Sequence, residues 1–159
     1  MTSRETQLVF SSPTAFLAFG FGSGLAPKAP GTFGTLAAVP FLWLLTLLNS
    51  WQYPLALILT FALGVYLCHA TSKRLGVHDH GGIVWDEFVG LWLTFYLVPL
   101  NWWTVLLGFA LFRVFDILKP WPIGYFDKRV HGGFGIMLDD IIAGAFAWLV
   151  LQGILRWFF

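Results

Sequence analysis

Seven charged residues stand beside long apolar segments, in three groups that are far apart along the chain. They are Asp86 and Glu87, then Arg113, Asp116 and Lys119, and finally Asp139 and Asp140. Arg113 and Asp116 are three residues apart, so on a helix they share one face. Ionisable groups next to such apolar segments are costly and are by default functional. The three groups therefore predict a functional site, provided that the fold brings them together.

The number of carboxylates in these groups suggests a hard divalent cation. Mg²⁺ prefers oxygen ligands and often binds through one or two carboxylates together with substrate phosphate. Its candidate ligands are the four acids that form adjacent pairs: Asp86, Glu87, Asp139 and Asp140. Adjacent helical residues point about 100° apart. We therefore expect one acid of each pair to bind the ion, and the other to bind a second ion or orient water.

Cationic side chains near the same acids suit the oxygens of a phosphate group. Arg113 and Lys119 are candidate phosphate ligands. Asp116 is expected to position Arg113 or to act as a general acid–base. The reaction class that this combination predicts is metal-assisted phosphoryl chemistry.

The loop over residues 24–34 supplies a further candidate phosphate ligand, Lys28. Its glycines and prolines make it stiff and rich in turns. We expect Lys28 to meet the substrate phosphate, with the Thr32 hydroxyl and the backbone of residues 31–34 donating nearby. The simpler alternative is that Lys28 only touches lipid headgroups. Likewise, an Asp at a helix start is often only a cap, and Arg113–Asp116 alone would be an ordinary surface pair.

The composition places these residues in a membrane protein. Apolar residues make up 58% of the 159 residues and charged residues 11%, against about 45–50% and about 25% in soluble domains. The mean hydropathy is +0.76. These values exclude a cytosolic enzyme, a nucleic-acid binder and a disordered chain. The net charge of +1 gives no indication that the protein binds a polyanion. With a single cysteine, the chain cannot form an internal disulfide.

The apolar segments predict a single all-α domain over residues 1–159, a polytopic integral membrane bundle with four to five spans. An N-terminal segment, Leu8 to Ala26, is too broken by Pro and Gly for a confident span, and we interpret it as an interfacial or re-entrant helix. The expected spans are Thr35–Leu48, Tyr53–Ala70, Ile83–Leu100, Trp102–Leu118 and Ile141–Phe159. The first is shorter than the roughly 20 residues that a crossing needs, so it must tilt or thin the bilayer.

Charge placement predicts the topology. With five spans, residues 1–34 and the loops 71–87 and 113–140 share one side, which carries eight of the nine cations and all eight acids. The loops 49–52 and 99–101 on the other side carry no charge. The positive-inside rule places the charged side in the cytoplasm. The candidate catalytic loops therefore face the cytoplasm.

Four stretches of the chain resemble the phosphatidylglycerophosphatase A family of bacterial inner-membrane lipid phosphatases. They are residues 27–34 (PKAPGTFG), Trp85-Asp-Glu with Gly90, residues 112–123 (FRVFDILKPWPI) and residues 132–140 (GGFGIMLDD). They follow the family's order and cover roughly residues 20 to 147. Two departures are minor: Thr35 stands where Ser is expected and keeps the hydroxyl, and Trp85 stands where a smaller apolar residue is common.

The resemblance implies Mg²⁺-dependent removal of the terminal phosphate of phosphatidylglycerophosphate, a lipid substrate, to give phosphatidylglycerol. The alternative is a small transporter or channel, which would spread charges across the membrane depth; a non-catalytic scaffold would leave the charged groups unexplained. Other reactive residues fit chemistry less well: Cys68 lacks a phosphatase signature, His78 and His80 suit a solvated loop, and His131 lacks the Ser-Gly-His context. The chain does not reveal the number of metal ions or the oligomeric state.

Overall fold

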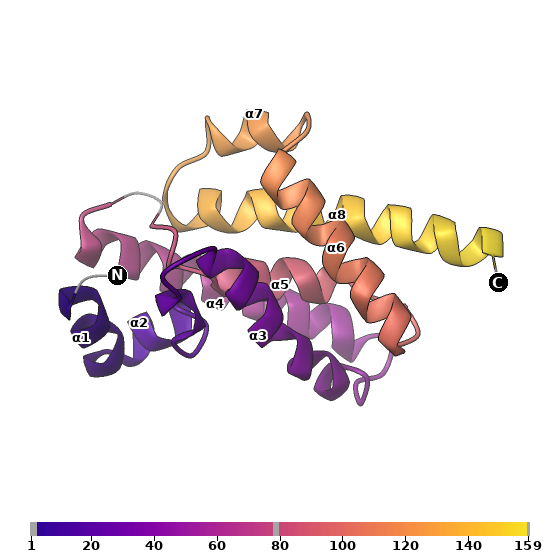
Figure 1. Cartoon of the computed structure of the whole chain (residues 1–159), viewed down its shortest axis with the longest axis horizontal. Coiled ribbons are helices and arrows are strands. Elements are labelled where there is room, and N and C mark those ends of the chain that lie inside the picture. The colour runs from indigo at the N-terminus through magenta and orange to yellow at the C-terminus, as the bar shows by residue number, and fades with distance from the viewer. Residues whose placement is uncertain (1–2, 78–79, 159) are drawn as a thin grey trace.

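The computed structural model describes residues 3–77 and 80–158, and within these ranges it is helical, with no β-strand (Figure 1). His78 and the end of the last expected span, Phe159, lie outside the described residues. The helices in chain order are α1 (Ser3–Ser11), α2 (Pro13–Ala18), η1 (Ser23–Leu25), α3 (Pro30–Leu45), α4 (Gln52–Leu75), α5 (Trp85–Thr94), α6 (Trp102–Leu118), α7 (Ile123–Asp127) and α8 (Gly132–Phe158). The all-α class is confirmed.

Two helices of the described chain, α4 and α8, are long and apolar enough to cross a membrane. They pack against each other along the bundle. Gly133 permits a close approach at the start of α8, because a Cβ there would collide with the backbone of α4 at Val65. At its C-terminal end, α4 stops at Gly76, whose positive φ of 70° is the usual left-handed conformation that ends a helix. The four to five crossings expected from the sequence are not established by this test.

Several expected helix boundaries are wrong, and α4, for example, ends at Leu75 rather than at Ala70. α3 begins at Pro30 rather than at Thr35, since proline suits the first turn of a helix. α5 covers only ten residues, Trp85–Thr94, and is therefore much shorter than the span expected over Ile83–Leu100. α8 begins at Gly132 rather than at Ile141, which places Asp139 and Asp140 inside the helix. The expected helix Trp102–Leu118 is confirmed as α6, which an Asn101–Thr104 capping box starts.

The N-terminal segment folds as short helices rather than one long helix. α2 packs on α4, and the side chain of Phe19 is fully buried. The amide of Val84, just before α5, donates to the carbonyl of Ala18 at 2.9 Å. The segment is therefore attached to the loop that leads into α5.

α5 lies at the centre of the bundle and packs on α3, α4 and α8. Its side chains Phe88, Val89 and Leu91 are fully buried. In Figure 1 the α3–α4 and α5–α6 connections lie near each other toward the lower right, whereas the segment before α5 lies at the left and α7 lies above α8. The beginning of α5, the end of α6 and the N-terminal part of α8 that holds Asp139 and Asp140 lie close together.

Candidate active site

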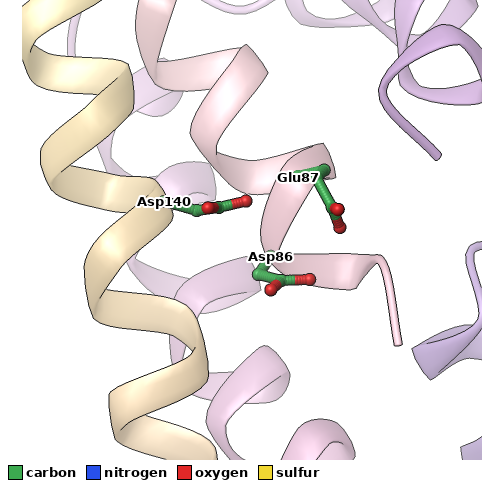
Figure 2. Close-up of side chains that lie close together, drawn as sticks. All are labelled: Asp86, Glu87 and Asp140. Carbon is green, nitrogen blue, oxygen red and sulfur yellow. The ribbon is translucent and has the colours of Figure 1, made fainter. Parts of the chain in front are cut away.

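Three carboxylates from two helices converge where α5 begins. Asp86 and Glu87 lie in the first turn of α5, and Asp140 reaches them from α8, so that one oxygen of each lies within 4.8 Å of the others (Figure 2). Their exposed fractions are 9%, 9% and 3%. We call these residues the carboxylate trio. Three acids in so small and dry a space repel one another unless a cation compensates them.

Two glycines bring the helices of the trio into contact. A Cβ on Gly144 of α8 would collide with the carbonyl oxygen of Gly90 on α5. A Cβ on Gly90 would lie 2.8 Å from the carbonyl oxygen of Asp140 and 2.6 Å from the Phe112 ring. Glycine is therefore needed at these positions for the helix backbones to approach each other. This close packing, about one turn from the acids, sets the distance of Asp140 from α5.

Arg113 of α6 connects the trio to the start of α3. Its Nη1 lies 2.6 Å from Asp116 Oδ2 and 3.8 Å from Glu87 Oε1. The same nitrogen donates to the Thr35 hydroxyl at 3.3 Å, and that hydroxyl donates to the Gly31 carbonyl at 2.8 Å. Asp116 and Thr35 therefore fix the guanidinium beside the carboxylates. Sequence reasoning noted the hydroxyl of Thr35 but did not include it in the site.

Gly31 fits closely against this arrangement. A Cβ at that position would collide with the Glu87 carboxylate and lie 3.2 Å from Arg113 Nη2. The backbone at the start of α3 therefore approaches Glu87 and Arg113 directly. The partial positive charge of a helix N-terminus adds to that of the guanidinium at this point.

Lys119 lies in a second cluster, in which it bridges two acids. Its Nζ is 2.6 Å from Asp127 Oδ1, on α7, and 2.5 Å from Asp139 Oδ2, on α8. Burial alone would lower the pKa of Lys119, but the hydrogen bonds to Asp127 and Asp139 outweigh it and raise the pKa. Lys119 therefore stays charged at neutral pH. Asp127 was not predicted from the sequence, since only its position on α7 brings it to Lys119.

The carboxylate trio lines one cleft of about 370 Å³ together with Lys119 and Asp139 of the second cluster. Its walls come from the beginning of α3, the segment before α5, the end of α6 and the inner face of α8. The predicted site residues that line it are Asp86, Glu87, Arg113, Asp116, Lys119, Asp139 and Asp140. The cleft therefore joins all three charged groups that the sequence singled out.

Two predicted phosphate ligands do not line the cleft. Lys28 is exposed, and Thr32 lies in the first turn of α3 without reaching the cleft wall. The prediction that both bind phosphate stays untested. Asp139 faces Lys119 and not the trio, so the expected four-acid ligand set divides into Asp86, Glu87 and Asp140 on one side and Asp139 on the other.

The trio has the donor chemistry of a Mg²⁺ site. Glu87 Oε2 and Asp140 Oδ2 are buried and have no hydrogen-bond partner among the described residues. A buried charged oxygen without a partner is costly. A hard cation that prefers oxygen ligands would compensate both atoms. The residues present therefore fit the expected metal.

The other reactive side chains that the sequence offered lie elsewhere. Cys68 is fully buried, with its sulfur 3.9 Å from that of Met137. His80 contacts Glu5 at 3.1 Å, and His131 is exposed beside the carbonyl of Arg129. Among the described residues, the buried acids all gather at the one cleft and do not extend along the bundle. This arrangement does not favour a transporter or channel.

Comparison with known proteins identifies the family. The family model for phosphatidylglycerophosphatase A matches residues 16–155. Phosphatidylglycerophosphatase A of Escherichia coli K12 is 55% identical over 141 residues, covering 88% of this chain and 82% of the relative. Phosphatidylglycerophosphatase A of Haemophilus influenzae is 50% identical over 148 residues, covering 92% and 91%.

A more distant relative has another name. The protein from Bacteroides thetaiotaomicron is 37% identical over 147 residues, covering 87% of this chain and 90% of the relative, and its name gives phosphatidylinositol-3-phosphatase as a provisional assignment. No solved structure matches the chain. The family model and the two phosphatidylglycerophosphatases each extend over most of the chain and over all three charged groups, and the chain therefore belongs to the phosphatidylglycerophosphatase A family, a family of phosphatases.

Proposed function

We propose that this enzyme hydrolyses the terminal phosphomonoester of phosphatidylglycerophosphate to phosphatidylglycerol and inorganic phosphate, with Mg²⁺ as cofactor. The convergence of Asp86, Glu87 and Asp140 within 4.8 Å, beside Arg113, carries the proposal. The names of the relatives from E. coli and H. influenzae support the substrate. The third relative carries a different provisional name, phosphatidylinositol-3-phosphatase.

The trio would hold Mg²⁺, which supplies charge compensation for the phosphate and activation of a water molecule when it is bound. Arg113 and Lys119 would bind phosphate oxygens from the other walls of the cleft and stabilise the charge that develops on them. Asp116 positions Arg113 through the 2.6 Å ion pair. We favour direct attack by water over a covalent aspartyl-phosphate.

In the proposed membrane arrangement, the loops alternate between the two sides as the charge placement predicts. α4 and α8, which are long and apolar enough to span a membrane, would cross the bilayer fully. α3 and α6, at about 24–26 Å, are shorter than the roughly 30 Å hydrocarbon core, so the bilayer thins around them. α5 and its flanking segments complete a fifth passage. The cleft faces the cytoplasm, at the inner membrane of a bacterium, because eight of nine cations lie at that end.

Topology is tested by labelling introduced cysteines in intact cells. Lys128→Cys and Ser50→Cys are both exposed positions, one at each end of the bundle, while the native Cys68 is buried. An impermeant thiol reagent is expected to label Ser50→Cys from outside and Lys128→Cys only after lysis. Labelling of Lys128→Cys in intact cells would reverse the orientation.

Phosphate release from phosphatidylglycerophosphate by the purified protein tests the activity. We expect turnover with Mg²⁺, loss of turnover with a chelator, and recovery when Mg²⁺ is restored. Asp140→Asn is the matched negative control, because it removes one trio carboxylate and keeps the side-chain volume. Release that is unaffected by the chelator would exclude the metal, and absence of release from this lipid would exclude the proposed substrate.

A further inference from the structure

An exposed apolar stripe runs along the whole of α6. Its large members are Trp102, Leu106, Val114 and Ile117, with exposed fractions of 77%, 62%, 49% and 66%. Ala110 is exposed between them. Steps of four, four, four and three residues keep these side chains on one face of a helix. The stripe spans about 22 Å along the helix axis at 1.5 Å per residue.

The stripe ends inside the catalytic cleft. Ile117 lines the cleft, next to Asp116 in the chain, although two thirds of its surface remains exposed. Arg113, on the adjoining face of α6, contacts Glu87 and Thr35, and Asp116 contacts Arg113. The apolar face and the charged face of α6 therefore meet at the wall of the cleft.

The beginning of α3 forms the opposite side of the same opening. Pro30 and Gly31 line the cleft, and Phe33 and Leu36 follow them with exposed fractions of 50% and 56%. Ile117 of α6 and Pro30 and Gly31 of α3 line the same cleft, so both helices contribute walls to it. The opening between them therefore has apolar edges and a charged floor.

We propose that the opening between α3 and α6 is the lateral access route for a phosphomonoester lipid, whose acyl chains lie along the α6 stripe while its phosphate rests on the floor of the cleft. The inference rests on the proposed function of the site. An amphiphile with a dianionic head matches this surface, because charge and apolar area are continuous at Ile117. A soluble phosphate ester would gain nothing from the stripe.

Matched polar substitutions separate this route from the rest of the lipid-facing surface. Ile117→Asn alters the stripe at the cleft, and Leu59→Asn alters a residue of α4 that is 61% exposed and does not line the cleft. For the long-chain lipid in mixed micelles, we expect Ile117→Asn to lower kcat/KM by about tenfold, mainly through KM. Leu59→Asn should leave kcat/KM within about twofold of wild type, as surface changes usually do. Equal values for the two variants would overturn the proposal.

Photo-crosslinking tests whether substrate lipid contacts the α6 stripe, and it does not depend on turnover. A photoreactive phenylalanine analogue replaces Ile117 in one variant and Leu59 in another, in phosphatidylethanolamine vesicles. The vesicles also contain a trace of a radiolabelled phosphonate lipid, whose C–P bond resists hydrolysis. We expect excess unlabelled phosphatidylglycerophosphate to suppress capture at position 117 but not at position 59.

Capture that is equal at both positions, or equally insensitive to competitor, would mean that Ile117 contacts only bulk lipid, and would overturn the proposal. The proposed function fails by a different result, since it requires phosphate release from phosphatidylglycerophosphate by the wild type. An enzyme that hydrolyses some other phosphomonoester lipid would still show competition at position 117 with that lipid. The two failures are therefore distinguishable.

Discussion

Asp139 and Asp140 are neighbours on α8, yet they belong to clusters of opposite character. Asp140 joins Asp86 and Glu87 within 4.8 Å. Arg113 lies 3.8 Å from Glu87, but its 2.6 Å ion pair is with Asp116, outside the trio. Asp139 instead contacts Lys119 at 2.5 Å. Two adjacent residues of α8 therefore belong to different clusters. The cluster of Asp140 needs a cation, whereas the cluster of Asp139 already contains one, the ammonium of Lys119.

The difference shows how a single helix can serve two purposes at one site. The trio concentrates negative charge in a buried space, where a divalent cation is the natural compensation. The second cluster holds Lys119 between Asp127 and Asp139, so that its ammonium is fixed at the edge of the cleft. We infer that Asp140 acts through the metal and Asp139 through Lys119. The predictions below test this division.

The largest difference is expected between Asp140→Asn and Asp139→Asn. Asp140→Asn removes one of the proposed metal ligands, and kcat should fall by about three orders of magnitude or more. Its residual activity should need more Mg²⁺ than the wild type requires. Asp139→Asn should lower kcat less and leave the Mg²⁺ dependence unchanged. Titration of kcat against Mg²⁺ measures both effects, and a shifted metal requirement in Asp139→Asn alone would contradict the division.

Arg113→Lys should have the next largest effect. Lysine keeps the charge but cannot reproduce the contacts of a guanidinium to Asp116, Thr35 and phosphate together. We expect kcat to fall by about a hundredfold, which is typical of losing one donor that stabilises the transition state. Arg74→Lys is the matched control, because Arg74 is exposed and donates to Ser12 away from the cleft. Similar kinetics in the two variants would show that charge alone suffices at position 113.

The trio was largely predictable from the sequence, because charge beside apolar segments is rare enough to be informative. Asp86 and Glu87 were expected at the start of a helix and lie there. The pairs on α5 and α8 were expected to lie together, and all four acids line one cleft, three of them within 4.8 Å of one another. Which acid of the second pair joins the trio depends on the rotation of α8, which the expected helix start at Ile141 did not give.

The remaining features depend on packing between distant segments. Glycines disfavour helix, yet Gly133 allows α8 to begin against α4. Asp127 carried no local signal, because its role follows from the position of α7 against α8. The contact of Thr35 with Arg113 joins residues 78 positions apart, and no local periodicity could have indicated it.

Asp127→Asn tests the second cluster with a smaller expected effect. The variant loses one charged acceptor of Lys119, while Asp139 keeps the other. Asp127 is one third exposed, so solvent screens much of the pairing. We expect kcat to fall between about threefold and tenfold, with KM and the Mg²⁺ requirement unchanged. Asp127→Glu should recover most of the loss if Asp127 positions Lys119; no recovery would mean that Asp127 serves only the packing of α7.

Lys28→Ala should have the smallest effect of the set, in contrast to Lys119→Ala. Lys28 is exposed and lies outside the cleft wall, whereas Lys119 lines the cleft between two acids. A lysine that only contacts headgroups contributes little to the transition state, so kcat at saturating substrate should stay within about threefold of wild type. Lys119→Ala should lower kcat by about a hundredfold, since it removes a charge that we propose acts on the reacting phosphate. A loss in Lys28→Ala that matches the loss in Lys119→Ala would establish Lys28 as a phosphate ligand, and would require the loop before α3 to close over the cleft when substrate binds.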